Sequence, residues 1–262
     1  MKDHPTMIEK LVINLGRIII SFFNIYIQLV LFLFKVGREI NFSLINRLNF
    51  RILLRELYNN TVKNFLYVVF SGFIVGGFLI NVILNILTNL NSYDRIGEFI
   101  VKSIFHLLSP FIVSIILLMR SAIRSMLEVA YLKNNQELNT YLFFDAIPEG
   151  SLFLPKILSF SISALILNFY FILFSLLGGY ILLGFLHHIT YENYIIQIVN
   201  YVGLFDIIRT SLKVVIISFF MALLSVKNGL YIYSLEINAI MKHIVNLSLI
   251  TIFTFFLVMN FI

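Results

Sequence analysis

The sequence is poor in cysteine, tryptophan and charge. Its 262 residues include no cysteine and no tryptophan, and only 12% are charged. The absence of cysteine excludes disulfides, thiolate metal sites and thiol nucleophiles. The low charge excludes a soluble globular protein, because about a quarter of the residues in such proteins are charged. The sequence also has no G-x-x-x-x-G-K-[ST] segment, so we expect no ATP site of that kind in this chain.

Apolar residues are abundant instead, and they occur in long runs. Hydrophobic residues make up 60% of the chain, and the mean hydropathy is +0.97. A membrane β-barrel would need short strands of alternating apolar and polar residues, whereas these runs are continuously apolar. The net charge of +6 does not indicate a nucleic-acid partner, because the basic residues flank the apolar runs. The fold class is therefore predicted as an all-α polytopic membrane protein.

Five runs are long enough to cross a bilayer, for which about 20 residues are needed. The spans are expected at Phe65–Leu87, about Gly97–Met119, Ile157–Leu186, Leu204–Val226 and about Ile244–Ile262. A kink is expected at Ser109-Pro110 in the second span. The stretch from His187 to Asn200 is more polar and is predicted as an outer loop. Its His187, His188 and Glu192 do not form a metal pattern, because adjacent histidines on a helix point about 100° apart.

The N-terminal apolar run from Ile18 to Phe34 has basic residues on both sides. We predict a helix lying in the membrane interface rather than a span, although its length does not decide between the two. The loop between Arg120 and Lys156 is also basic, so the positive-inside rule favours an N-in/C-out orientation. The organisation predicted is an interfacial and connecting segment over 1–63 and a five-helix domain over 64–262.

Small and amide residues recur at helical spacing within the spans. Gly72 and Gly76 in the first span predict close approach of another helix, and the same packing role is assigned to Gly178 and Gly179 in the third. Asn81, Asn85 and Asn89 also recur every four residues. They either bond neighbouring helices or line a polar-edged cavity, and packing is slightly favoured.

Two groups of charged residues have the same spacing of four. Arg120, Arg124 and Glu128 follow the second span, where extension of the side chains to the interface alone would explain them. Arg209 and Lys213 lie near the start of the fourth span. They are either interfacial anchors or cations for a phosphate head group.

The order of several short motifs resembles the MlaE/YrbE permeases of MCE-associated ABC transporters. The resemblance runs from Leu54 to the C-terminus and is carried by the following positions: Leu54-Arg55-Glu56-Leu57-Tyr58, Ser71-Gly72, Gly76, Arg120, Glu128, Gln136-Glu137-Leu138, Pro148, Pro155-Lys156, Gly178-Gly179, Asp206, Lys213 and Asn228-Gly229. Where the family usually reads Arg-Glu-Leu-Gly-Pro, this chain has His106-Leu107-Leu108-Ser109-Pro110, so only the leucine and the proline are retained. The chain looks like a divergent member.

The resemblance implies a homodimer in the bacterial inner membrane that moves phospholipid between membranes. It implies a cytoplasmic ATPase partner that holds ATP and Mg, and a periplasmic MCE-domain partner. It also implies a coupling helix near 133–145 that contacts the ATPase. Its anchors would be Leu138, Tyr141 and Leu142, with Gln136 and Glu137 as polar contacts, and Arg120, Arg124 and Glu128 would orient it. Lys213 aligns with a lysine near the family's lipid cavity, to which Arg209, Asn81 and Asn85 are also assigned.

The chain is therefore predicted to be a non-catalytic permease with no cofactor or metal of its own. An ion-coupled carrier is one alternative, but it would need an ionisable residue in mid-span, and the spans have almost none. A membrane-embedded lipid-modifying enzyme is the other, and it would need a convergent catalytic set. Only the group of His187, His188 and Glu192 comes near that requirement.

Overall fold

The computed structural model describes residues 27–32, 34, 36, 47–89, 96–143, 149–187 and 191–261, and all regular structure in these ranges is helical. Five helices are long and apolar enough to span a membrane: Phe50–Ile86, Gly97–Asn134, Ser151–Ile181, Leu204–Tyr231 and Ile237–Phe261. The predicted all-α, five-span architecture is confirmed.

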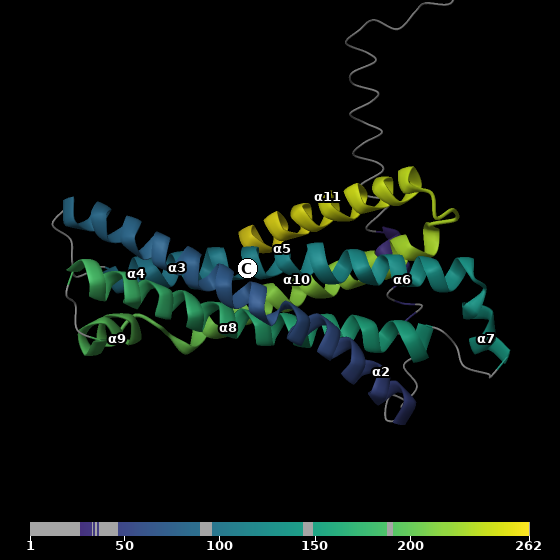
Figure 1. Cartoon of the computed structure of the whole chain (residues 1–262), viewed down its shortest axis with the longest axis horizontal. Coiled ribbons are helices and arrows are strands. Elements are labelled where there is room, and N and C mark those ends of the chain that lie inside the picture. Colours follow the sequence, from purple (N-terminus) through teal and green to yellow (C-terminus); the bar gives the residue numbers. More distant parts are fainter. Residues whose placement is uncertain are drawn as a thin grey trace, which may run out of the picture.

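The described part of the chain consists of the following elements, of which the α-helices are labelled in Figure 1. The α-helices are α2 (Arg47–Leu57), α3 (Lys63–Asn89), α4 (Ile96–Ile100), α5 (Ser109–Leu117), α6 (Ile123–Asn134), α7 (Glu137–Phe143), α8 (Leu154–His187), α9 (Tyr191–Val199), α10 (Leu204–Tyr231) and α11 (Ile237–Phe261). Wider π-helical turns join or precede some of them: η2 (Tyr58–Val62), η4 (Val101–Leu108), η5 (Leu118–Ala122) and η6 (Glu149–Phe153).

The helix that contains the first span begins well before Phe65, where the span was predicted to start. α2, η2 and α3 follow one another without a break, so the helix crosses the domain boundary predicted at position 63. The apolar period is hidden there by polar residues such as Glu56, Asn60 and Asn64. All three are buried in the structure, because side chains of other helices bond them.

The second span changes its helical pitch next to Ser109-Pro110, where a kink was predicted. Pro110 lies in the first turn of α5, directly after the π-helical turns of η4. Proline lacks the N–H that a regular helix needs, so a change of helical pitch is expected next to it. The span then continues through η5 and α6 to Asn134. Gln136, which has a positive φ of 58°, separates α6 from the short helix α7.

α3 and α8 lie against each other along much of their length, with small residues at the contact. A Cβ on Gly76 would overlap the backbone of Ser175, and one on Gly178 would overlap the carbonyl of Phe73. A Cβ on Gly72 would lie 3.0 Å from the carbonyl oxygen of Phe171. Glycine therefore allows the two backbones to meet at these positions.

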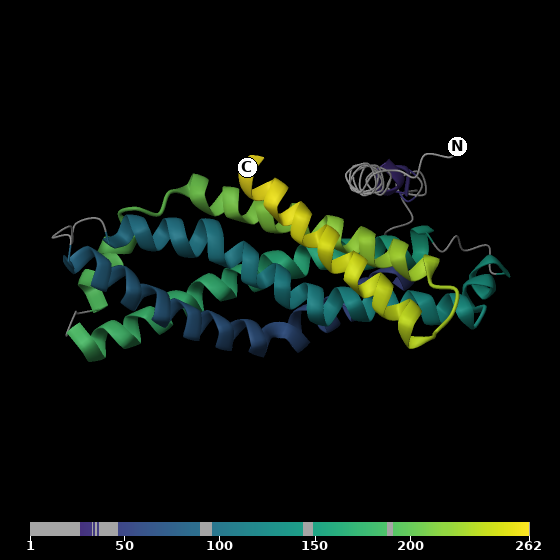
Figure 2. The same ribbon diagram turned by 90° about the horizontal axis from the view of Figure 1, so that it is seen from above.

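α10 is the central helix of the bundle and contacts α5, α6, α8 and α11. Every residue from Met221 to Gly229 is buried. α11 packs against α10 and crosses the bundle obliquely (Figure 2). α10 thus provides most of the contact between α11 and the rest of the bundle, and the rings of Phe255 and Phe111 add a contact between α11 and α5.

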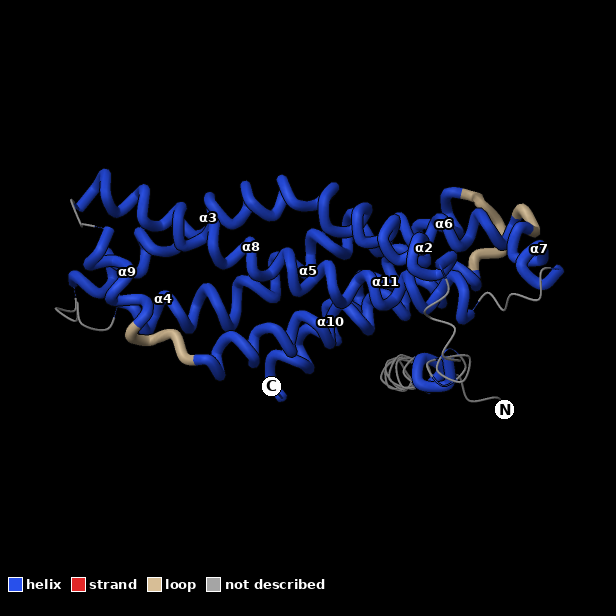
Figure 3. The backbone as a smooth tube through the Cα atoms, turned by 90° about the horizontal axis from the view of Figure 1, so that it is seen from below, coloured by secondary structure: helices blue, strands red, loops and turns tan. Residues whose placement is uncertain are grey.

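The two ends of the bundle carry different elements (Figures 1 and 3). One end, called the α7 end here, carries α7, the end of α10 and the start of α11. The opposite end, called the α9 end, carries α4 and α9. α8 connects both ends, and its 34 residues extend over about 51 Å, which exceeds the roughly 30 Å of bilayer hydrocarbon.

At the α9 end, the stretch predicted as a loop is partly helical. α9 covers Tyr191–Val199, and its Tyr194 and Ile198 are buried against residues of α3, α4 and α8. The Tyr194 hydroxyl donates to the Leu176 carbonyl at 3.0 Å, and burial raises the pKa of Tyr194. The prediction of an open loop was wrong here, because the polar residues of the stretch masked a buried face.

The predicted N-terminal helix over Ile18–Phe34 falls largely outside the described residues. Within it, residues 27–32 are helical, and Leu29 is buried in the core of the bundle. The Lys227 ammonium of α10 donates to the Gln28 amide oxygen at 2.9 Å. Whether the segment spans the membrane or lies in the interface stays a prediction.

Candidate functional site

α7 lies beyond the ends of α6 and α8, at one extremity of the molecule (Figure 1). Its Leu138 is half-buried and packs against the hydrophobic core of the chain itself. The neighbouring Gln136, Glu137, Asn139 and Thr140 are exposed. Tyr141 and Leu142 are residues of α7, but the structure describes only their backbone and not their side chains. The exposed face of α7 among the described side chains is therefore polar.

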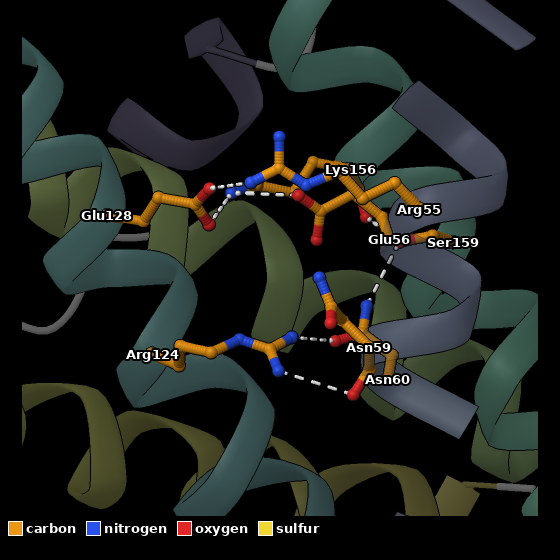
Figure 4. Close-up of polar contacts among 8 residues, drawn as sticks. All are labelled: Arg55, Glu56, Asn59, Asn60, Arg124, Glu128, Lys156 and Ser159. Carbon is orange, nitrogen blue, oxygen red and sulfur yellow. Dashed lines mark hydrogen bonds and ion pairs between the residues drawn. The ribbon is translucent and has the colours of Figure 1, made fainter. Parts of the chain in front are cut away.

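A cluster of charged side chains fastens the helices that carry α7 (Figure 4). The Lys156 ammonium of α8 donates to Glu128 Oε2 of α6 at 2.6 Å and lies 3.3 Å from Glu56 Oε1 of α2. Arg55 of α2 lies 3.9 Å from Glu128 Oε1. We call Arg55, Glu56, Glu128 and Lys156 the clamp. Since α6 leads into α7 and α8 follows it, the clamp holds both stems of the α7 hairpin and ties them to α2.

Burial makes the clamp energetically sensitive. The Lys156 side chain is 1% exposed and the Glu56 side chain 5%, so both charges are removed from water. Such a group is tolerated when it is paired, and removal of one partner leaves an uncompensated buried charge. Sequence reasoning did not assign a role to Lys156. The feature of the sequence that could have indicated a buried lysine is its position directly after Pro155, at the start of a long apolar run.

Arg120 and Arg124 contact the first span rather than each other. Arg124 Nη2 donates to Asn60 Oδ1 at 2.7 Å, and Asn60 Nδ2 in turn donates to Ser159 Oγ at 3.1 Å. Arg120 Nε donates to Asn64 Oδ1 at 3.0 Å, and the Arg120 guanidinium lies 3.7 Å from the centre of the Tyr67 ring. The row of charges that the spacing indicated thus binds the second span to the first.

The last turn of α6 is bonded to the end of α10. The Lys133 ammonium donates to the Leu230 carbonyl and lies 3.7 Å from the centre of the Tyr233 ring. Asn134 Nδ2 donates to the Ile232 carbonyl at 3.3 Å. A helix leaves its last carbonyls without partners, and at the end of α10 side chains of α6 donate to them. A displacement of α7 and α6 would therefore reach the connection between α10 and α11.

A separate polar pocket of about 430 Å³ lies toward the α9 end, and Arg209 and Lys213 both line it. Its other lining residues are Glu98, Val101, Lys102, His106, Tyr201 and Asp206. Asn81 and Asn85, which were assigned to the same cavity, are not among them. The structure therefore brings together only the cationic half of the predicted set.

The pocket contains a hydrogen-bonded pair of side chains, His106 and Asp206, that the sequence alone did not indicate. His106 Nε2 and Asp206 Oδ1 are 2.8 Å apart, and Asp206 Oδ2 also accepts the Gly203 N–H at 2.9 Å, at the start of α10. Lys102 and Glu98 pair at 2.6 Å. Lys213 is only 4% exposed, and no carboxylate of the described residues forms an ion pair with it. A buried ammonium of this kind can pair with an anionic group that enters the pocket.

Comparison with family models matches residues 53–262 to the family described as "Permease MlaE". The match begins within α2 and continues to the last residue, so it includes the clamp, α7 and the pocket. A search of curated proteins finds no match.

Proposed function

The chain belongs to the MlaE permease family, and from this premise we propose that it is the membrane subunit of an ABC transporter for phospholipid. In this proposal the chain forms a homodimer in the bacterial inner membrane and moves phospholipid between that membrane and the periplasm or outer membrane. A separate cytoplasmic ATPase binds ATP and Mg and supplies the energy. A periplasmic MCE-domain protein exchanges lipid with the α9 end.

The projecting helix α7 on its clamped base is the observation that carries the proposal. A coupling helix has to transmit displacement, so it needs a surface that a partner can contact and a rigid connection to the spans. The exposed residues 136, 137, 139 and 140 offer the surface. The ion pairs of Lys156 with Glu128 and Glu56 offer the connection.

Movement of α7 would then spread through contacts between helices. The clamp links α6 and α8 to α2, and Lys133 links α6 to the end of α10. ATP-driven closure of the partner would shift these helices together, in the manner of small sliding movements of packed helices. The last span, which follows α10, would be displaced with them.

The pocket toward the α9 end is the proposed contact for the lipid head group. Lys213 and Arg209 would pair with the phosphate, because charge-assisted hydrogen bonds to phosphate are strong. The acyl chains would lie against apolar surface of the spans, where burial costs no polar desolvation. The His106–Asp206 pair occupies one wall and leaves Lys213 available.

Co-purification of the ATPase tests the proposal. We expect an affinity-tagged chain, purified from its native membrane, to recover an ATPase. Because Leu138 packs against the chain's own core, the exposed polar face is the better target. The double substitution Glu137→Arg with Asn139→Asp should reduce recovery at least tenfold.

Glu236→Arg is the matched control, because Glu236 is an exposed carboxylate at the same end of the bundle, in the connection before α11. It should leave recovery unchanged. No ATPase in the wild-type preparation, or equal recovery with the α7 variant, would refute coupling through α7. Lipid transport by the isolated chain, without nucleotide or partner, would refute the proposal that a separate ATPase supplies the energy.

A further inference from the structure

A second hollow lies at the α7 end, on the side of the bundle where the first and second spans face each other. It has a volume of about 670 Å³ and is called the basal groove here. One wall is formed by α2, η2 and the start of α3, with Arg55 and Lys63. The other is formed by η5 and α6, with Arg120, Arg124 and Glu128. It is distinct from the pocket toward the α9 end, with which it shares no lining residue.

The charges of the basal groove are unbalanced. Four cationic side chains and a single carboxylate line it, and that carboxylate, Glu128, is already bound to Lys156 at 2.6 Å. Among the side chains that the structure describes, no carboxylate forms an ion pair with Lys63, Arg120 or Arg124. The two arginines bond only neutral oxygens of the first span, and these bonds use one of the five N–H donors of Arg120 and two of those of Arg124.

Apolar side chains lie beside these cations. Met119 is 67% exposed and Tyr131 is 54% exposed, and Ile123 and Leu127 lie on the same wall. A patch that joins guanidinium groups with exposed hydrophobic side chains matches an amphiphile with an anionic head and an apolar tail.

The depth of the groove matches the level of lipid head groups. The apolar run of the second span ends at Met119, directly before Arg120. At 1.5 Å per residue, Arg120 lies about 21 Å along the helix from Asn134, and Arg124 about 15 Å. The span of 38 residues is about 27 Å longer than the hydrocarbon needs, so this segment can extend past the hydrocarbon at the α7 end.

Two protein occupants of the basal groove are disfavoured: a second copy of the chain, and the partner that contacts α7. A second copy of the chain placed on the groove about a two-fold axis would bring identical cationic surfaces together. A partner that contacts α7 would meet the extremity of the molecule, whereas the groove opens beside the spans, closer to the bilayer.

We propose that the basal groove binds an anionic phospholipid, whose phosphate lies between Lys63 and Arg120 and whose acyl chain lies along Met119 and Leu127. The lipid belongs to the leaflet on the α7 side, and naming that leaflet cytoplasmic rests on the proposed function. Lipid bound here would fill the space between the first two spans and stabilise their contact.

Binding of labelled lipid to the purified full-length chain tests the groove. The chain, delipidated in detergent, is titrated with fluorescent phosphatidylglycerol and with phosphatidylcholine carrying the same label. We expect phosphatidylglycerol to bind at least tenfold more tightly. The double substitution Lys63→Gln with Arg120→Gln should lower its affinity at least tenfold and bring it near that of phosphatidylcholine.

Lys242→Gln is the control, because Lys242 is exposed on α11 and lies outside the groove. It should leave both affinities unchanged. Equal affinity of the wild type for the two lipids, or no change in the groove variant, would overturn the proposal. If the double variant loses helicity, Lys63→Gln alone is used instead, and its affinity for phosphatidylglycerol should fall about threefold.

Photo-crosslinking identifies the occupant in native membranes. A photoreactive amino acid at Met119, the most exposed apolar position of the wall, should crosslink to phospholipid. Crosslinks to a second copy or to another protein, without lipid, would overturn the proposal. The result is separable from the coupling proposal, since Lys63→Gln alone, which changes no residue assigned to coupling, should still recover the ATPase.

Discussion

At the scale of single residues, the α7 end depends on a few polar groups that are buried and paired. Lys156 pairs with two carboxylates from different helices, and Asn60 joins Arg124 to Ser159. Paired groups of this kind contribute little net stability, yet loss of one partner is costly. A substitution at one of these positions should therefore lower stability mainly because it leaves the partner group buried without a counter-ion or hydrogen bond.

Replacement of Lys156 by methionine should destabilise the chain by about 3–5 kcal/mol, because Glu56 and Glu128 lose their buried counter-ion. Thermal unfolding in detergent, followed by circular dichroism, measures the change. Addition of Glu56→Gln should recover part of the loss, and the exposed Lys242→Met should stay within about 0.5 kcal/mol of wild type. A Lys156→Met variant as stable as wild type would contradict the clamp.

The glycines of the α3–α8 contact should differ in their tolerance of a methyl group. Gly76→Ala overlaps the backbone of Ser175 and should cost about 3 kcal/mol, since the helices have to separate. Gly72→Ala places its Cβ 3.0 Å from the Phe171 carbonyl oxygen and should cost about 1 kcal/mol. Unfolding with an anionic detergent compares the two. Equal losses of stability in the two variants would contradict the expected difference between the two positions.

At the scale of elements, the sequence predicts the apolar spans well and their polar ends poorly. Five spans and the short helix after the second one were predicted correctly. The helix that contains the first predicted span begins earlier than the span, because Glu56 and Asn60 look solvent-exposed until their partners from α8 are known. For the same reason the sequence could locate Arg209 and Lys213 but not the His106–Asp206 pair, whose members are one hundred positions apart.

The bond between the ends of α6 and α10 is predicted to transmit movement. Lys133→Met removes the hydrogen bond to the Leu230 carbonyl and the contact with the Tyr233 ring. In the reconstituted transporter we expect ATP hydrolysis within twofold of wild type and lipid transport per ATP reduced at least fivefold. Lys242→Met should change neither quantity. Equal loss of hydrolysis and transport would indicate a general structural role instead.

At the scale of the whole molecule, the bundle presents two cationic hollows at different ends. The basal groove lies near α7, and the smaller pocket lies toward α4 and α9. α8, with 34 residues, connects the two ends. A lipid transporter needs contact with lipid at one side of the membrane and release toward the other, so the opposed hollows suit the proposed task.

The absence of cysteine allows the orientation to be measured directly. Asn139→Cys on α7 and Asn200→Cys before α10 each place one thiol at an exposed position. A membrane-impermeant maleimide should label Asn200→Cys in cells with a permeabilised outer membrane. Asn139→Cys should be labelled only after the inner membrane is opened. The reverse pattern would invert the proposed topology.

The clamp also constrains how the chain is made. Glu56 and Glu128 leave the ribosome before Lys156, although both carboxylates pair with its ammonium and Glu56 is buried with it. Until the third span is synthesised, both carboxylates must stay hydrated or find a temporary counter-ion. The buried position of Glu56 can therefore form only after α8 has been synthesised, so this end of the bundle is completed only when the third span is present.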